Sequence, residues 1–131
     1  MKRSPIKPSQ KPLKRIAFLR AKPAKFKAKK QARKAAETAH FRRVASLPCA
    51  CCGIVGYSQC AHSNLAEHGK GLGLKAHYLT TFPLCCARPG VLGCHSRHDR
   101  LIGMTKDEAD SITDFYIDWT HKALGIVANS P

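Results

Sequence analysis

The chain has 131 residues, with 23 Lys/Arg against 8 acidic residues, and its formal net charge is +15. The whole excess lies in residues 1–43, which hold sixteen Lys/Arg and one acid, whereas residues 44–131 hold seven of each sign. No run of about 18 apolar residues and no apolar signal core is present, which excludes a membrane-spanning helix and argues against secretion. Such a cationic segment is attracted to polyphosphates through counterion release.

The first third of the chain predicts a basic arm. Residues 1–30 are rich in lysine, proline and alanine and show no sustained apolar period. We expect residues 1–40 to form a largely disordered DNA-binding arm and residues 41–131 to form the folded domain. Four prolines in the arm argue against an amphipathic mitochondrial presequence. The arm cations that we expect to contact DNA are Lys22, Lys25, Lys27, Lys29, Lys30, Arg33 and Lys34.

Short elements are predicted through the middle of the chain. Residues 31–47 favour a helix that ends at Pro48, because proline disfavours the helical conformation in the residue before it. A tight turn and a short strand are predicted over 53–60, and a second strand over 78–84. The glycine-rich loop between them carries two further expected DNA contacts, Lys70 and Lys75.

The C-terminal third predicts a short helix that starts near Cys94 or His95 and then a longer one. Thr105 with Glu108 three residues later is a capping box, and Gly125 can close the longer helix. Residues at helical spacing that we expect to face the core are Ile112, Phe115, Tyr116, Trp119 and Ala123. The sequence thus predicts an α+β fold with little apolar material, for which a structural metal would compensate.

The seven cysteines all lie between Cys49 and Cys94. Because we expect a reducing cytoplasmic environment, they are better interpreted as metal ligands than as disulfides. Cys49 and Cys52 have zinc-knuckle spacing, and Cys85 with Cys94 is the expected second pair of a structural zinc site. The neighbouring Cys51 and Cys86 are open alternatives to Cys52 and Cys85.

Histidines beside these cysteines indicate a second, catalytic site. On a helix, His95 shares a face with Asp99 at i+4 or with His98 at i+3, and either pair can hold a divalent cation with open positions. Magnesium prefers carboxylate and water ligands, while manganese or zinc accepts more imidazole. His62, at the end of the first predicted strand, can accept a proton from water as a general base.

These segments together resemble a known family. Residues 43–53 (RVASLPCACCG), 58–64 (SQCAHSN), 69–76 (GKGLGLKA) and 82–85 (FPLC), followed by Cys94-His95, are similar to the recombination-enhancement (Ref) nucleases of phages and prophages. These are RecA-dependent members of the HNH, or ββα-metal, endonuclease superfamily. The resemblance covers roughly residues 40–123.

The resemblance implies a small zinc-stabilised ββα-metal (HNH) core with flanking helices. His62 would be the general base, Asn64 would orient the site, and His95 would bind Mg²⁺ or Mn²⁺ with Asp99 or His98 nearby. The zinc would tie the two motifs together through the flanking cysteines. The products would carry a 5′-phosphate and a 3′-hydroxyl, the partners would be DNA and a RecA filament, and the setting would be the cytoplasm of a bacterial host.

Three positions depart from the family pattern. Ala61 stands where many HNH sites have a metal ligand, Thr80 lies near the expected asparagine, and Tyr78 replaces an expected aspartate, so that His77 before it is a candidate substitute ligand. A non-catalytic, zinc-stabilised DNA-binding module is therefore the alternative function. A redox or metal-storage protein would explain neither the basic arm nor the interleaved histidines.

Overall fold

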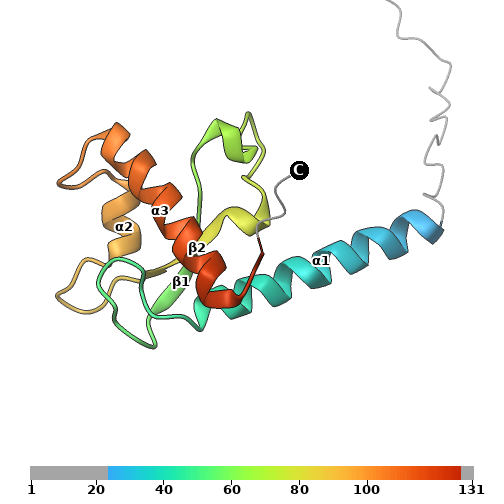
Figure 1. The fold of residues 1–131 in the computed structure, drawn as a ribbon, viewed down its shortest axis with the longest axis horizontal. Helices are drawn as coiled ribbons and strands as arrows, with labels where there is room; N and C mark the ends of the chain where they lie inside the picture. Colours follow the sequence, from blue (N-terminus) through green and yellow to red (C-terminus); the bar gives the residue numbers. More distant parts are fainter. Residues whose placement is uncertain (1–23, 128–131) are drawn as a thin grey trace, which may run out of the picture.

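The structure, a computed structural model, describes residues 24–127 and has an α+β architecture, in agreement with the expected fold class. Three helices surround a two-stranded sheet, and the first helix extends away from the body (Figure 1). Within the described range no helix is long and apolar enough to cross a membrane. The elements are α1 (Ala24–Ala45), β1 (Ser58–His62), β2 (Thr81–Cys85), α2 (Cys94–Asp99) and α3 (Lys106–Leu124), with 3-10 turns η1 (Ala66–His68) and η2 (Tyr78–Thr80).

The sheet is an antiparallel pair in which Ser58 is opposite Cys85 and His62 is opposite Thr81. All five residues of β2 are buried, because α1, α2 and α3 all contact this strand. The turn and short strand predicted over 53–60 appear as a bend at Val55 and Gly56 followed by β1, which runs two residues further than predicted, to His62. The strand predicted over 78–84 begins later, at Thr81, because the residues before it form η2.

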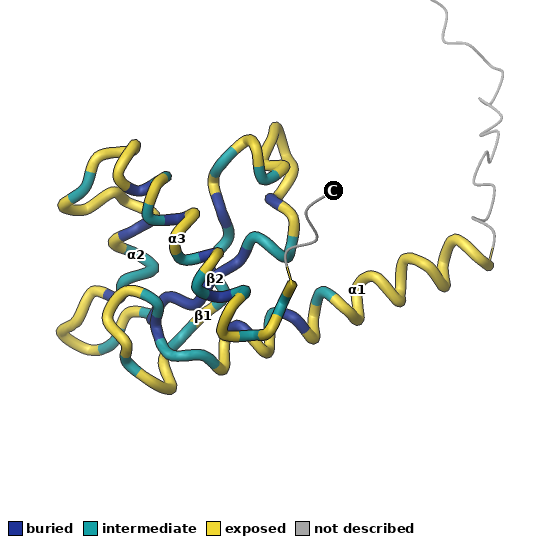
Figure 2. Tube along the Cα trace, in the orientation of Figure 1, coloured by how far each residue is buried: buried dark blue, intermediate teal, exposed yellow. Residues whose placement is uncertain are grey.

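The helix α1 begins earlier than the sequence analysis predicts. It starts at Ala24, so the expectation of disorder fails for residues 24–30, where the good helix propensity of lysine and alanine prevails over charge repulsion. Residues 1–23, including the predicted DNA contact Lys22, lie outside the described range. Along α1 only His40 and Val44 are buried, and its outer half is exposed throughout (Figure 2).

The inner end of α1 is tied to the rest of the fold by two polar contacts. The buried His40 places its Nε2 at 3.1 Å from Thr81 Oγ1, at the start of β2. Burial lowers the pKa of His40, with His121 adding to the effect, which favours the neutral ring. The guanidinium of Arg43 donates to the carbonyl oxygen of Leu124 (2.6 Å), the last residue of α3.

The ends of α3 form as predicted. The Thr105 hydroxyl accepts from the Glu108 N–H while the Glu108 carboxylate accepts from the Thr105 N–H, which completes the capping box. Gly125 adopts a left-handed conformation (φ 66°) and donates to the carbonyl oxygens of His121 and Lys122.

The buried face of α3 differs from the prediction. Phe115 is 64% exposed, and the stripe expected inside is only partly buried. Two threonines are buried instead, and each satisfies its hydroxyl on the carbonyl oxygen four residues before it (2.6–2.7 Å). The buried residues of α3 are Ala109, Thr113, Ile117 and Thr120.

Candidate functional site

Four cysteine sulfurs converge at one point of the fold. The Sγ atoms of Cys49, Cys52, Cys85 and Cys94 all lie within 4.8 Å of one another, and those of Cys52 and Cys85 are 3.8 Å apart. Four sulfurs at zinc-ligand bond lengths on a tetrahedron stand about 3.8 Å apart. The cluster therefore has the composition and the spacing to hold a structural metal such as zinc.

Three separate segments supply these sulfurs. Cys49 and Cys52 lie on the turn after α1, where the Cys49 N–H donates to the Ile54 carbonyl oxygen (2.9 Å). Cys85 ends β2, and Cys94 begins α2. The N–H of Cys85 approaches Cys49 Sγ (3.4 Å) and that of Cys94 approaches Cys85 Sγ (3.3 Å), so backbone donors already point at the sulfurs. The cluster therefore connects the turn after α1, the sheet and α2.

The environment of the cluster favours one thiolate in the absence of metal. Burial opposes ionisation of Cys49, but the backbone N–H groups of Cys52, Cys85 and Cys51 outweigh it and lower the pKa of this thiol to about 7. Burial and the neighbouring thiols raise the pKa of Cys94 instead. A bound cation would stabilise all four thiolates. Cys51 and Cys86, the alternatives considered from the sequence, lie outside the group of four.

A polar pocket of about 230 Å³ opens between the end of β1, the glycine-rich loop and α2. The pocket is lined by the predicted general base His62, by Asn64 and by the expected metal-binding pair from α2. Both lysines of the glycine-rich loop also line it. Its lining residues are His62, Asn64, Lys70, Lys75, Ala76, His95 and Asp99.

His62 enters this pocket from the last position of β1. The ring of Phe41, from α1, stands edge-on against it with a centroid distance of 5.5 Å, which fixes one side of the imidazole. Burial lowers the pKa of His62, and the charges of Lys75 and His95 lower it further. The neutral ring, the form that accepts a proton, is therefore favoured near neutral pH.

The expected metal-binding pair comes from α2. His95 Nε2 lies 3.4 Å from Asp99 Oδ2, as the i+4 spacing predicts. On its other side, His95 Nδ1 lies 3.3 Å from Gln59 Oε1, so the amide can accept from Nδ1–H, which leaves the Nε2 lone pair available to a cation shared with Asp99. Gln59 is a residue that sequence reasoning missed. This arrangement resembles the way in which an outer hydrogen bond orients a ligating histidine.

Two candidate ligands are directed elsewhere. His98 is buried, its Nε2 lies 3.0 Å from Thr113 Oγ1, and its ring is against Phe82. His77 is exposed, and its Nδ1 accepts from the Leu79 N–H. Neither lines the pocket, so the structure favours Asp99 over His98 as the partner of His95 and gives no support to His77 as a substitute ligand.

The three positions that depart from the family pattern have structural contacts. Ala61 is 1% exposed and belongs to the core, on the opposite face of β1 from His62. The Tyr78 ring stands against His40, and the Thr80 hydroxyl donates to the His77 carbonyl oxygen (2.6 Å). These side chains support the ends of α1 and β2.

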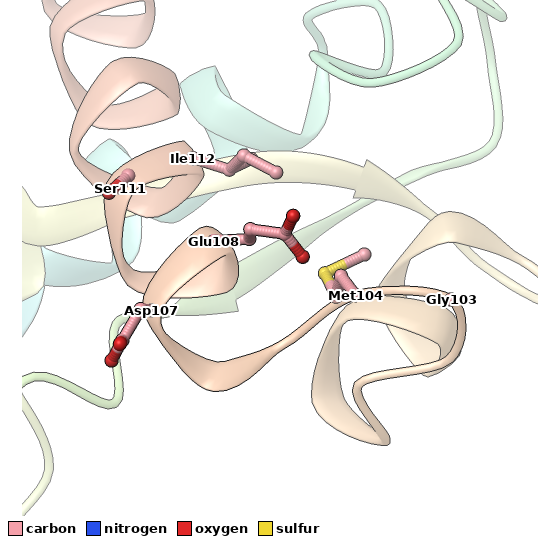
Figure 3. Close-up of a pocket in the computed structure, with 6 residues that line it drawn as sticks. All are labelled: Gly103, Met104, Asp107, Glu108, Ser111 and Ile112. Atoms are coloured by element: carbon pink, nitrogen blue, oxygen red, sulfur yellow. The ribbon is translucent and has the colours of Figure 1, made fainter.

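A larger hollow, of about 580 Å³, lies beside the first turn of α3, but none of the described histidines, lysines or cysteines lines it (Figure 3). Its wall contains Met104, Ile112 and two carboxylates, of which Glu108 is engaged in the capping box. The smaller pocket carries histidines, a carboxylate and lysines together, and we therefore take it as the candidate site.

Comparison with known proteins adds no relative. The chain matches no protein-family model, no curated protein and no solved structure.

Proposed function

We propose that the protein is a divalent-metal-dependent DNA endonuclease with the site design of the recombination-enhancement nucleases. The observation that supports this proposal best is the content of one pocket. It joins a general-base candidate, His62, to the His95–Asp99 pair and to two lysines. A non-catalytic DNA-binding module has no need of a neutral histidine across a pocket from an imidazole–carboxylate pair.

In this proposal His62 accepts the proton of the attacking water. Its lowered pKa keeps the Nδ1 or Nε2 lone pair free near neutral pH, and Phe41 restricts its rotation. Asn64 lines the same pocket and can hold the water or a phosphate oxygen. Lys70 and Lys75 supply positive charge for the phosphate that is cleaved.

The donor set that α2 contributes to the pocket fits Mg²⁺ or Mn²⁺. Asp99 provides a carboxylate and His95 an imidazole oriented by Gln59, which leaves positions open for water and phosphate. A cation bound there would stabilise the charge that develops on the leaving oxygen. The products would then carry a 5′-phosphate and a 3′-hydroxyl.

The exposed outer half of α1 supports DNA as the substrate. Its side chains form a cationic surface on a helix that stands away from the body (Figure 1). Such a surface binds phosphates with little sequence preference. We further propose, from the resemblance alone, that the target is DNA held by a RecA-type filament. The exposed cations of its outer half are Lys25, Lys27, Lys29, Lys30, Arg33 and Lys34.

The proposal is tested by cleavage assays on naked supercoiled DNA and on recombinase-paired DNA, each with and without Mg²⁺ or Mn²⁺. We expect metal-dependent cleavage by the wild-type protein and a loss of about 10²–10⁴-fold in rate for His62→Ala, the usual contribution of a general base. His77→Ala is the matched control, because this histidine lies outside the pocket, and it should cleave at the wild-type rate.

Two results would contradict the proposal. Cleavage that survives His62→Ala would mean that another group acts as the base or that a contaminant cleaves the DNA. If the zinc-loaded wild-type protein binds DNA but cleaves neither substrate with either metal, the binding module is the better account.

A further inference from the structure

The most exposed large apolar side chain of the described residues stands at the tip of the glycine-rich loop. Leu72 is fully exposed (105% of its reference area) and Leu74 is 66% exposed. The loop rises from the sheet and is drawn almost wholly as exposed (Figure 2). Two leucines so placed lose favourable burial unless a partner covers them.

The tip is a formed turn. The N–H of Gly71 donates to the Leu74 carbonyl oxygen (3.3 Å) and the Leu74 N–H donates to the Gly71 carbonyl oxygen (3.0 Å), which closes a tight hairpin. Gly73 takes the positive φ (70°) that this turn needs. Leu72 is therefore presented in one arrangement, and a partner need not order the loop first.

The position of the turn indicates which partner covers it. Lys70 and Lys75 flank the closing pair, and both line the pocket that contains His62. A phosphodiester bound in that pocket would meet the lysines, and the leucine tip lies beyond them. The main apolar surface of a duplex is the stacked faces of its bases, which apolar side chains reach by entering between base steps.

We propose that Leu72 is a wedge that enters between adjacent base pairs of duplex DNA bound at the His62 pocket, unstacking that step and bending the duplex. The inference rests on the proposed function in its choice of DNA, but it requires binding only and not cleavage. Cations on the loop hold the backbone, and the leucine separates the bases. Leu74, next to the tip, would cover the opened step.

The test uses a duplex that carries a fluorescent adenine analogue whose emission rises when it unstacks, titrated with zinc-loaded protein without Mg²⁺ or Mn²⁺. We expect wild-type protein to raise the emission, and Leu72→Ser to abolish most of that rise at saturation while binding about tenfold more weakly. Leu72→Met should keep the rise, because its side chain is also long and apolar. The salt dependence of binding should be the same for all variants, since no charge changes.

Val91→Ser is the matched control. Val91 is a 47% exposed apolar residue on another tight turn, closed by its pairing with Arg88, and it does not line the His62 pocket. It should behave as wild type in emission and affinity. Equal zinc content and circular dichroism of all variants would show that each is folded.

The outcomes separate the wedge from the nuclease. If the protein cleaves DNA and Leu72→Ser binds and unstacks as wild type does, the wedge is overturned and the nuclease stands. If Leu72-dependent unstacking occurs without any cleavage by the wild type, the wedge stands and the enzyme does not. If Leu72→Ser loses only binding to a recombinase filament, the leucine is a protein contact and the wedge is overturned. Failure of the wild type to bind duplex overturns the wedge, while the nuclease is then decided by the cleavage assay on recombinase-paired DNA.

Discussion

His62 shows how neighbours adjust one side chain. Its ring is half-buried at the end of β1, and burial alone lowers its pKa. The ammonium of Lys75 is the next largest contribution, because a nearby positive charge disfavours the imidazolium. The lysine therefore has two effects in the proposed site, one on the phosphate and one on the base.

We predict that Lys75→Gln raises the pKa of His62 in the free protein. Removing the positive charge stabilises the imidazolium, so protonation begins at a higher pH. NMR titration of the imidazole C–H signals checks this, with His62→Gln used for assignment. In the wild-type protein the midpoint should lie below the ordinary value of 6.5.

Lys122→Gln is the control for this experiment. It removes an equal charge from the last turn of α3, and this lysine is not among the charges that act on His62. An unchanged His62 midpoint in Lys75→Gln, or equal shifts in both variants, would show that Lys75 does not act on His62 as the structure indicates. If the protein is the proposed nuclease, the acid limb of the pH–rate profile of Lys75→Gln should also move to higher pH.

Residue spacing predicts only part of this site. The i+4 spacing of His95 and Asp99 is local and therefore readable from the sequence. Which face of α2 meets the core is not local, and the structure turns His98 inward. Gln59 and Phe41 were missed for the same reason, because each reaches its histidine only through the pairing of distant segments.

At the scale of elements, Gly93 marks the place where a Cβ added to a described glycine would meet its neighbours most closely. It precedes α2 with an ordinary extended backbone (φ −67°, ψ 155°), so an alanine could adopt its conformation. A Cβ there would nevertheless lie 2.5 Å from the Cys85 carbonyl oxygen and even closer to the Cys86 carbonyl carbon. Backbone atoms cannot yield as a flexible side chain does, so α2 would have to move away from β2.

We predict that Gly93→Ala lowers the free energy of unfolding by about 1–3 kcal/mol, the usual cost of overpacking, and weakens metal retention, because Cys94 moves with α2. Urea unfolding and zinc content check both effects. Gly71→Ala is the control: no atom lies within 4 Å of its Cβ and its φ is not positive, so stability should barely change. Equal stability of the two variants would contradict the close approach of Gly93 to the backbone of Cys85 and Cys86.

The elements themselves were predicted with uneven success, and the errors have physical causes. The ends of α3 depend on Thr105, Glu108 and Gly125 within one helix, so the sequence contains the whole signal. Its buried face depends on the space above β2, which accepts Thr113 and leaves Phe115 outside. The spacing of apolar residues indicates which face of a helix is apolar, but it does not indicate how large a side chain fits above the sheet.

For the molecule as a whole, the hydrophobic core and the cysteine cluster share residues. Cys49 and Cys85 are two of the six buried members of the core, and Cys94 is against it. Phe82 and Leu84 are its largest buried apolar side chains. Loss of a bound metal would thus leave thiolates or thiols without their partner inside the main core.

We predict one tightly bound zinc per chain and loss of the cooperative fold when a chelator removes it. Structural zinc contributes about 10–16 kcal/mol, which matches or exceeds the whole stability of a typical domain. Metal analysis of freshly purified protein and thermal melts before and after chelation check this. Cys49→Ser should purify with less metal and melt without a transition.

Cys60→Ser is the control for the zinc prediction. Cys60 lies on β1 outside the group of four sulfurs, so this variant should retain its metal and its melting transition. A metal-free wild-type protein that melts as cooperatively as the purified one would show that the four cysteines stabilise the fold as ordinary core residues.

The one-sided attachment of α1 has a consequence for where a duplex would be cut. The helix is fixed at its inner end by His40 and Arg43, and every residue from Ala24 to Ala36 is exposed. Thirteen helical residues span about 20 Å, which is somewhat more than half of one turn of B-DNA. If a duplex were held by this stretch and cleaved at His62, the length of α1 would set the number of base pairs between the bound segment and the cut.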